Sequence, residues 1–330
     1  MPIGLINSSV GGTSVESWTS MPAQSAVAAI KPRLDAWKAQ DDEYDENTAR
    51  ANFRKAMDRY NGQVATAKDA GRKAPRRKPQ LAARPRSDRN YPSNLFNGKI
   101  NPLIGYTIKG AVWYQGENSS GRGFSHLYGH QLTTLINDWR ARWGQGDFPF
   151  AWVQLPNFKA PQTQPVETNG WTLVQEGMLK TLAVPGTGMA ITLDVGEEKD
   201  IHPKDKQSVG HRLAQWALAS VYHFDILPMG PVYRSSKIDG NRVIVEFDHA
   251  DGLTSKTDTV SGFAICGDDR KFVWADARID GQKVIVSSDK VSNPVSVRYA
   301  WAANPVYSLY NKAGIPASPF RTDTWEERAE

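Results

Sequence analysis

The feature that most constrains the fold of this chain is a regular alternation of apolar runs and helical patterns between residues 109 and 221. Three nearly continuous apolar runs are typical of strands that are covered on both faces. These runs are residues 109–114, 148–155 and 188–194. The segments that follow them have apolar residues at helical spacing: 127–143, 171–182 and 204–221. Strands that alternate with helices predict an α/β fold with a parallel sheet between two layers of helices.

The first residues of the chain are also apolar. Residues 1–7 predict a short strand, followed by a glycine turn and a short helix that reaches about Ser20. They have no basic region, long apolar stretch or cleavage-like site, so they do not have the pattern of a signal peptide. A buried strand that starts at residue 2 indicates either a very compact protein or a chain whose upstream part is absent.

The pattern changes after Pro228. Short β runs alternate there with Asp-Gly and other turn signals, as in an antiparallel β structure. We therefore predict two domains, an α/β domain at residues 1–228 and a small antiparallel β module at residues 229–330. The α/β domain is interrupted at about 30–92 by a charged insertion of helix and loop.

The net charge of +5 comes from one Pro-rich segment within this insertion. Arg72–Arg89 holds eight basic residues and one acidic residue, so it contributes +7 and leaves −2 for the rest of the chain. Such a run is usually a solvated loop, and the alternative is a polyanion-binding segment. No aromatic residues interleave with the charges to stack on bases, so we expect no nucleic acid partner.

Other classes of protein are excluded by composition. The single cysteine, Cys266, rules out an internal disulfide framework and a cysteine-based zinc cluster. The six histidines show no H-E-x-x-H spacing, and we expect no metal and no cofactor. No apolar run approaches the roughly 20 residues of a membrane helix.

Polar loops follow the predicted strands, where open parallel sheets bind ligands. The first loop contains Gly11 and Gly12, whose backbone N–H groups can face an anion or oxyanion closely, although a Gly-Gly pair is more often a plain tight turn. No P-loop lysine follows it. The second loop is Gln115-Gly116-Glu117-Asn118. Its polar side chains have either a functional role or a role in packing the loop.

The third loop contains His202, the one histidine that we place between a buried strand and a helix. A general base needs a fixed tautomer and a pKa near neutrality, and a neighbouring carboxylate such as Asp200 can supply both. The alternative is a surface histidine without a catalytic role.

Together, these loops resemble one family. The blocks PIGLINSSVGGTSVESW, IKGAVWYQGENSS and DIHPKDKQSVGHRLAQWAL resemble the sialate O-acetylesterase branch of the SGNH (GDSL-type) hydrolases, as does much of the C-terminal sequence. The resemblance implies a flavodoxin-like three-layer α/β hydrolase domain that removes acetyl groups from carbohydrates. In such enzymes a serine attacks the acetyl carbonyl and a histidine acts as base and then as acid.

The resemblance also implies roles for individual residues. His202 matches the catalytic histidine, and Gly11 or Gly12 matches the block that offers an oxyanion N–H. Gln115 and Asn118, in the block with Gly116 and Glu117, match a side-chain oxyanion donor or a substrate contact.

The position of the catalytic acid departs from the family. The family often has an acid three residues before the histidine, but Lys199 is there in this chain. Asp200 stands two residues before His202 and is one candidate. Asp194 is another, and a Ser-His dyad is a third possibility.

The nucleophile departs further, because the family's G-Q-S-N block is absent from the 330 residues. The apolar start and the resemblance together indicate that the first strand and its serine lie upstream of Met1. Ser8 or Ser9 is a weak substitute. We therefore consider both an acetylesterase acting on acetylated carbohydrate and a carbohydrate-binding relic that has lost its nucleophile. Family members are often secreted or periplasmic, and the sequence leaves the localisation and oligomeric state open.

Overall fold

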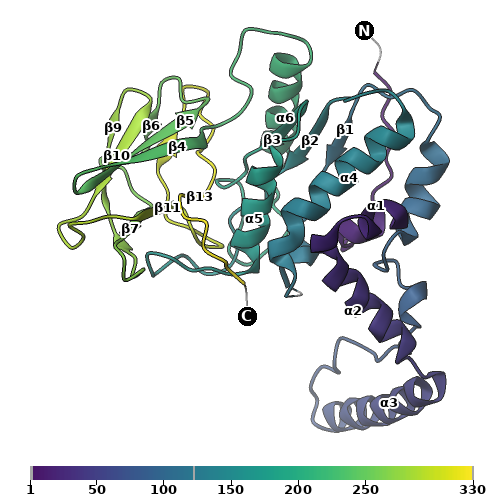
Figure 1. Cartoon of the computed structure of the whole chain (residues 1–330). Coiled ribbons are helices and arrows are strands. Elements are labelled where there is room, and N and C mark those ends of the chain that lie inside the picture. The colour runs from purple at the N-terminus through teal and green to yellow at the C-terminus, as the bar shows by residue number, and fades with distance from the viewer. Residues whose placement is uncertain (1–2, 122, 329–330) are drawn as a thin grey trace. The chain divides into compact units, whose positions relative to one another are not determined.

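The computed structural model describes residues 3–121 and 123–328 of the chain. These residues form two compact units. Unit 1 consists of Met1–Val15 and Leu103–Glu330, and unit 2 consists of Glu16–Pro102. Unit 1 contains both the central sheet and the C-terminal β structure (Figure 1). The division at residue 228 stays a prediction.

The central sheet of unit 1 is parallel, as predicted. Its strands are β1 (Ala111–Trp113), β2 (Phe150–Val153) and β3 (Thr187–Ala190), paired in the order β1-β2-β3. Both pairings are parallel. Each strand overlaps one of the predicted apolar runs, and all four residues of β2 are buried. The carboxyl ends of the three strands therefore meet at one edge of the sheet.

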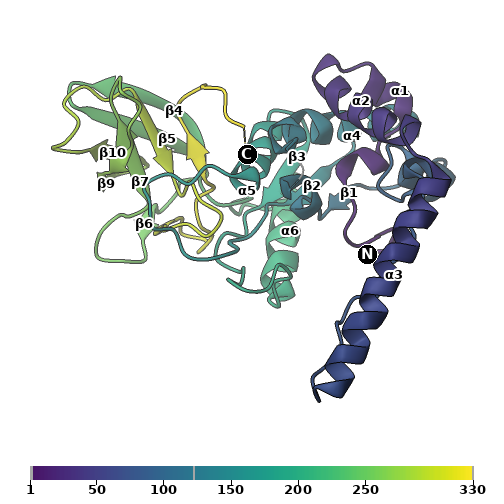
Figure 2. The same ribbon diagram turned by 90° about the horizontal axis from the view of Figure 1, so that it is seen from below.

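Helices cover both faces of this sheet (Figure 2). They are α4 (Tyr128–Trp143), α5 (Gly170–Thr181) and α6 (Lys206–Ser220). The helices α4 and α5 pack against each other, whereas α6 packs on β2 and β3. The predicted apolar face of α4 is buried, and a left-handed Gly144 ends the helix. Within the described part of the chain, no helix is both long and apolar enough to cross a membrane.

Glycines allow these layers to approach closely. A Cβ on Gly177 of α5 would lie 2.6 Å from the backbone nitrogen of Gly129 in α4. A Cβ on Gly188 of β3 would lie 1.9 Å from Nε1 of Trp216 in α6. Close packing of both helix layers therefore depends on positions without a side chain.

The C-terminal part of unit 1 is an antiparallel β structure, as predicted. Its sheets have the strand orders β4-β5-β10-β9, β13-β11-β7-β8 and β12-β6. The strands are β4 (Val232–Asp239), β5 (Arg242–Asp248), β6 (Thr254–Ser255), β7 (Phe263–Cys266), β8 (Val273–Trp274), β9 (Asp276–Asp280), β10 (Lys283–Ser287), β11 (Ser296–Tyr299), β12 (Leu309–Tyr310) and β13 (Phe320–Arg321). Aromatic residues fill the space between the strands, with the Phe320 ring 4.8 Å from Tyr233 and 5.6 Å from Phe247. The predicted α/β fold with a C-terminal antiparallel module is confirmed.

The prediction of an N-terminal strand is wrong for the residues that the structure describes. Residues 1 and 2 lie outside them, and Ile3–Asn7 form no strand. The side chains are exposed, with Ile3 at 72% and Leu5 at 92%. An apolar segment becomes a strand only beside a hydrogen-bonded neighbour, and β2 is the only described partner of β1.

Unit 2 is helical, as expected for the predicted insertion. It contains α1 (Met21–Ser25), α2 (Lys31–Asp42) and α3 (Glu46–Asp69). The helical part of the predicted insertion is divided into α2 and α3, because Asp45 is extended and accepts a hydrogen bond from the Thr48 backbone N–H as an N-cap. In the core of the unit, the Glu16 carboxylate accepts hydrogen bonds from Arg33 and from Trp37 Nε1, at 2.7 and 3.1 Å.

The close contact between α4 and α5 predicts opposite effects for two Gly→Ala substitutions. Gly177→Ala places a methyl group against Gly129 backbone, so we expect the free energy of unfolding to fall by about 1–3 kcal/mol. The methyl group of Gly210→Ala in α6 meets nothing within 4 Å, and alanine lowers the backbone entropy of the unfolded chain. We therefore expect the free energy of unfolding to rise by about 0.5–1 kcal/mol. Urea denaturation of both variants checks this. Equal effects would contradict the packing argument.

Candidate active site

Gln115 lies at the carboxyl end of β1 and is 7% exposed. Its Nε2 donates to the Thr13 carbonyl oxygen at 2.9 Å and to Ser119 Oγ at 3.2 Å. The Tyr128 hydroxyl lies 3.0 Å from Gln115 Oε1 and 2.9 Å from its backbone oxygen. Both amide protons of Gln115 are therefore used in holding the loops together.

Asn118 makes a similar contact with the glycine loop. Its Nδ2 donates to the Gly12 carbonyl oxygen at 2.9 Å. The second proton of that amide has no acceptor among the described residues, and the buried Oδ1 accepts no hydrogen bond there. Gly12 has φ +70°, which an L side chain rarely adopts. The structure therefore brings the two predicted loops together through Gln115 and Asn118.

Glu117, in the second predicted loop, is half-buried and is affected by the charges of two residues that follow β3. Burial raises the pKa of its carboxyl above the ordinary value, while the charges of His202 and Lys206 act in the opposite direction. The neighbouring Gly116 has no room for a side chain, because a Cβ would lie 2.9 Å from both Leu155 and Met178. The second and third predicted loops are thus within electrostatic reach of each other.

Tyr114 and Lys206 form a second link between β1 and α6. Lys206 Nζ donates to the Tyr114 hydroxyl at 3.4 Å and lies 4.8 Å from the centre of its ring. Burial, with a smaller effect of the Glu117 charge, raises the pKa of Tyr114 to about 12. The Tyr114 hydroxyl therefore stays protonated at neutral pH.

His202 lies in the loop between β3 and α6, and its side chain is 84% exposed. The Asp200 carboxylate accepts a hydrogen bond from the His202 backbone N–H at 2.9 Å, and the same oxygen lies 3.4 Å from His202 Nδ1. The backbone hydrogen bond is the main reason that the pKa of Asp200 is lowered. Asp200 is thus placed to orient the His202 ring.

Asp194, the other candidate acid, has a different partner. Arg212 of α6 binds both of its carboxylate oxygens, at 2.6 and 2.9 Å, and also donates to the Ile191 carbonyl oxygen at 2.7 Å. This bidentate pair fixes the start of α6 against the end of β3. Of the two acids, only Asp200 contacts His202 in the described structure.

The substitute nucleophile Ser9 is not joined to this group. Ser9 is exposed, and its backbone N–H donates to Asn7 Oδ1 at 3.0 Å. In the described residues no hydrogen bond connects its hydroxyl to His202. Gly11 is also exposed, and its side-chain position faces open space.

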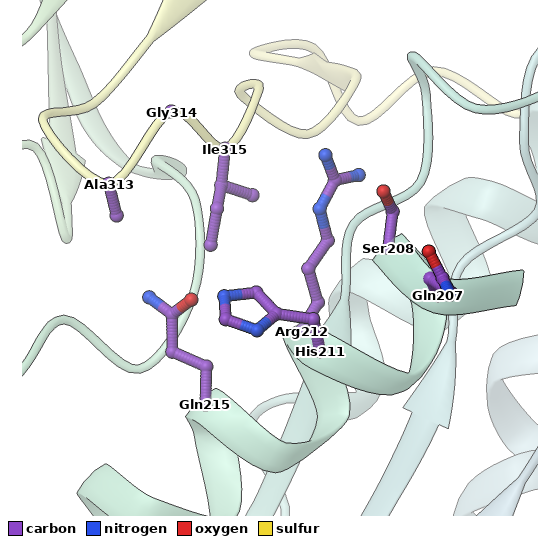
Figure 3. Close-up of a pocket in the computed structure, with 8 residues that line it drawn as sticks. All are labelled: Gln207, Ser208, His211, Arg212, Gln215, Ala313, Gly314 and Ile315. Carbon is purple, nitrogen blue, oxygen red and sulfur yellow. The ribbon is translucent and has the colours of Figure 1, made fainter. Parts of the chain in front are cut away.

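A separate hollow of about 410 Å³ lies along α6. Figure 3 shows His211, Arg212 and Gln215 projecting from this helix toward the chain around Ile315. None of the predicted catalytic residues lines it. The described residues contain no group of three or more His, Cys, Asp or Glu that could hold a metal ion.

Sequence reasoning missed three contacting residues, Tyr128, Lys206 and Arg212. Tyr128 begins a helix whose apolar face was recognised, but its bond to Gln115 joins positions 13 residues apart. Lys206 is the first residue of α6, and Arg212 lies nearly two turns into it. Only their positions relative to β1 and β3 distinguish them.

A known protein family matches the part of the chain that contains most of these residues. Residues 90–219 match the family model described as carbohydrate esterase, sialic acid-specific acetylesterase. The match includes the Gln115–Asn118 loop, Asp200 and His202, and excludes Ser9, Gly11 and Gly12. Over these residues the chain is similar to the sialate O-acetylesterase-like carbohydrate esterases. Its fold is consistent with the SGNH superfamily.

Two curated relatives of this esterase-like chain are the mouse and human sialate O-acetylesterases. Each is 27% identical over 344 aligned residues, which cover 97% of the chain. The alignments cover 60% of the mouse protein and 57% of the human protein. The chain thus spans about 60% of the length of the mouse relative.

A solved structure, that of a carbohydrate acetylesterase from Xanthomonas citri, is also similar. It is 41% identical with a TM-score of 0.68, over 72% of this chain and 56% of that one. The matching family and this solved structure are both described as acetylesterases.

The half-buried carboxyl of Glu117 predicts a distinctive pH dependence of stability. Because its pKa is raised on folding, the wild type loses stability as the pH rises from the unfolded pKa through the folded one. Glu117→Gln cannot ionise at this position. The free energy of unfolding of the variant, relative to that of the wild type, should therefore rise across this pH window and stay constant at higher pH. Urea denaturation from about pH 4 to about pH 8 measures this.

The exposed Glu198→Gln controls for the change in net charge. Parallel curves for Glu117→Gln and the wild type would contradict desolvation of Glu117.

Proposed function

We propose that this chain hydrolyses acetyl esters on carbohydrates through a serine–histidine acyl-enzyme mechanism. The observation that carries the proposal is the pair of hydrogen bonds from Gln115 and Asn118 to the Thr13 and Gly12 carbonyl oxygens. These bonds join the two loops that supply oxyanion donors in the resemblance, at the sheet edge where His202 follows β3. The names of the relatives support acetylated sugar as the substrate class.

His202 acts as the base in this mechanism. A serine Oγ attacks the acetyl carbonyl carbon and transfers its proton to the imidazole of His202. The tetrahedral intermediate collapses, the sugar oxygen leaves with that proton, and the acetyl group stays on the serine. Water then attacks the acyl-enzyme with His202 again as base, which releases acetate and restores the serine. Asp200 stabilises the imidazolium that forms at each step.

Asn118 is better suited than Gln115 to donate to the oxyanion. Both amide protons of Gln115 are already used inside the protein, whereas Asn118 uses only one. A donor that is fixed by one hydrogen bond and has one proton free is preorganised for developing charge. Gln115 is then a positioning residue for the loop.

In the same mechanism, the glycine loop supplies backbone N–H donors to the oxyanion. Because a trans peptide directs its C=O and N–H groups to opposite sides, the carbonyl of Gly12 faces Asn118 and the N–H of Thr13 faces away. Among the described residues, the N–H groups of Gly11 and Gly12 have no hydrogen-bond partner. They are the candidates for the backbone part of the oxyanion hole.

One alternative is a carbohydrate-binding protein that no longer turns over its ligand. The absence of a G-Q-S-N block favours it, as does the lack of a hydrogen bond between Ser9 and His202. Without a nucleophile, such a protein keeps only binding and oxyanion stabilisation.

Hydrolysis of an aryl acetate by the purified chain separates these functions. For the esterase we expect His202→Ala to lower kcat/KM by about 10²–10⁴-fold, because it removes the general base. His130→Ala, which removes an exposed histidine of α4, should leave the rate unchanged. A wild-type rate equal to that of His202→Ala would favour the binding protein.

Covalent labelling with a fluorophosphonate, followed by peptide mapping, identifies the nucleophile in the same samples. Modification of Ser9 that is lost in Ser9→Ala would make it the substitute nucleophile. Modification of another serine, with full activity in Ser9→Ala, would exclude it.

The division of roles between Asn118 and Gln115 is tested by a second pair of variants. Asn118→Ala should lower kcat by about 10²–10³-fold, because it removes an oxyanion donor. Gln115→Ala leaves several buried partners unsatisfied, so it should lower the free energy of unfolding by about 1–3 kcal/mol. Steady-state kinetics and urea denaturation of both variants measure the two effects. Unchanged kcat in Asn118→Ala would remove it from the oxyanion hole.

A further inference from the structure

Unit 2 contains a segment of concentrated positive charge that the esterase mechanism does not use. We call residues 46–89 the basic arm; it holds 13 basic and four acidic residues, a net charge of +9. The remaining residues of the chain have a net charge of −4, since the whole chain is at +5. The net positive charge of the chain thus comes from one part of one unit.

The arm is a helix with an extended segment folded back along it (Figure 1). The helix α3 has 24 residues, of which Ala67 alone is buried. The Tyr60 hydroxyl donates to the Pro75 carbonyl oxygen at 3.4 Å, and Tyr44 donates to the Ala82 carbonyl oxygen at 3.1 Å. The returning segment therefore covers one side of α3 and leaves the charged side chains outside.

The base of the arm is held by a buried carboxylate. Asp41 is 1% exposed and forms ion pairs with Arg84 and Arg86. The side-chain hydrogen bond from Arg86 is the main cause that lowers the pKa of Asp41 to about 2. Two of the arm's arginines thus have a structural role at this end.

Most of the other cations have no acidic partner. Arg50 pairs with Glu46 within α3. Ten basic side chains of the arm form no ion pair within the described residues: Arg54, Lys55, Arg59, Lys68, Arg72, Lys73, Arg76, Arg77, Lys78 and Arg89. All ten are exposed, so the arm presents uncompensated charge along its length.

We propose that the basic arm binds a linear polysaccharide that carries carboxylate groups. Repulsion among closely spaced cations is relieved when a polymer of opposite charge lies along them, and release of its counterions adds to the binding. Arginine side chains bind carboxylates through two parallel hydrogen bonds. The choice of a carbohydrate polymer rests on the proposed carbohydrate esterase function.

The surface of the arm fits nucleic acid less well. Its aromatic residues are Phe53 and Tyr60, both half-buried, so it offers no exposed ring on which bases can stack. The helix also carries the returning segment along its side, which makes it wider than the single helix that a major groove of about 12 Å admits.

A lipid surface is also a poorer fit. Helices that lie on membranes insert a face of large apolar side chains. Leu81 is the one large hydrophobic residue of the arm that is exposed, at 40%. The charge is therefore not accompanied by the apolar surface that insertion needs.

The test uses binding of the full chain to polygalacturonate, which has one carboxylate per sugar, with neutral dextran as the uncharged polymer. The arm variant is Arg76→Gln, Arg77→Gln and Lys78→Gln combined, since these exposed side chains have no ion-pair partner in the described structure. The control variant, Lys237→Gln with Lys271→Gln and Lys290→Gln, removes the same charge from exposed positions of the β module. Titration calorimetry at several salt concentrations gives the affinities.

We expect polygalacturonate to bind, dextran not to bind, and added salt to weaken the complex with a slope that falls in the arm variant. The arm variant should bind at least about tenfold more weakly than the wild type, and the control less than about twofold. Equal weakening of both variants, or no binding by the wild type, would overturn the proposal. So would tighter binding to double-stranded DNA or to phosphatidylserine vesicles at matched charge.

Aryl acetate hydrolysis by the same proteins separates this proposal from the esterase function. The arm variant should retain the wild-type rate, because the substituted residues take no part in the proposed mechanism. Binding without hydrolysis would leave the arm proposal standing and remove the esterase. Hydrolysis without polymer binding would do the reverse.

Discussion

The buried amide of Gln115 is the interaction on which the candidate site depends. Its Nε2 bonds to the Thr13 carbonyl oxygen and to Ser119, and its Oε1 lies 3.0 Å from the Tyr128 hydroxyl. These contacts join the glycine loop, the turn after β1 and the start of α4. An unpaired amide at this depth would cost about 1–3 kcal/mol, so the loops are held in the one arrangement that satisfies it. Asn118, with one proton free, takes its position from that arrangement.

The elements that the sequence predicted correctly are those with a strong local period. The apolar runs that form β1, β2 and β3 are covered by helices. Their continuous apolar composition is therefore enough to predict them as strands. The segment Ile3–Asn7 has the same composition, but no described strand pairs with it, and its side chains are exposed. A strand depends on its neighbour as well as on its own residues. The break between α2 and α3 depends on one side chain, Asp45, which caps the second helix.

The same distinction applies to the site. Asp200 and His202 are two residues apart, and their contact follows from that spacing. The partners that could not be predicted are distant in sequence: Arg212 holds Asp194 across 18 residues, and Lys206 reaches Tyr114 across 92. The first of these pairs changes the interpretation of the catalytic acid. A guanidinium binds both oxygens of Asp194, so the negative charge of Asp194 is already paired. Asp200, in contrast, contacts His202.

Glu117 shows how the electrostatics of a single residue help to identify a site of this kind. A carboxyl that is half-buried, as Glu117 is, lowers the stability of the folded state once it ionises, and packing alone would favour an apolar residue there. The cost is reduced by the positive charges of His202 and Lys206, which come from the loop and helix after β3. Glu117 thus lowers the stability of the fold close to the proposed base, and local costs to stability of this type tend to be concentrated at functional sites.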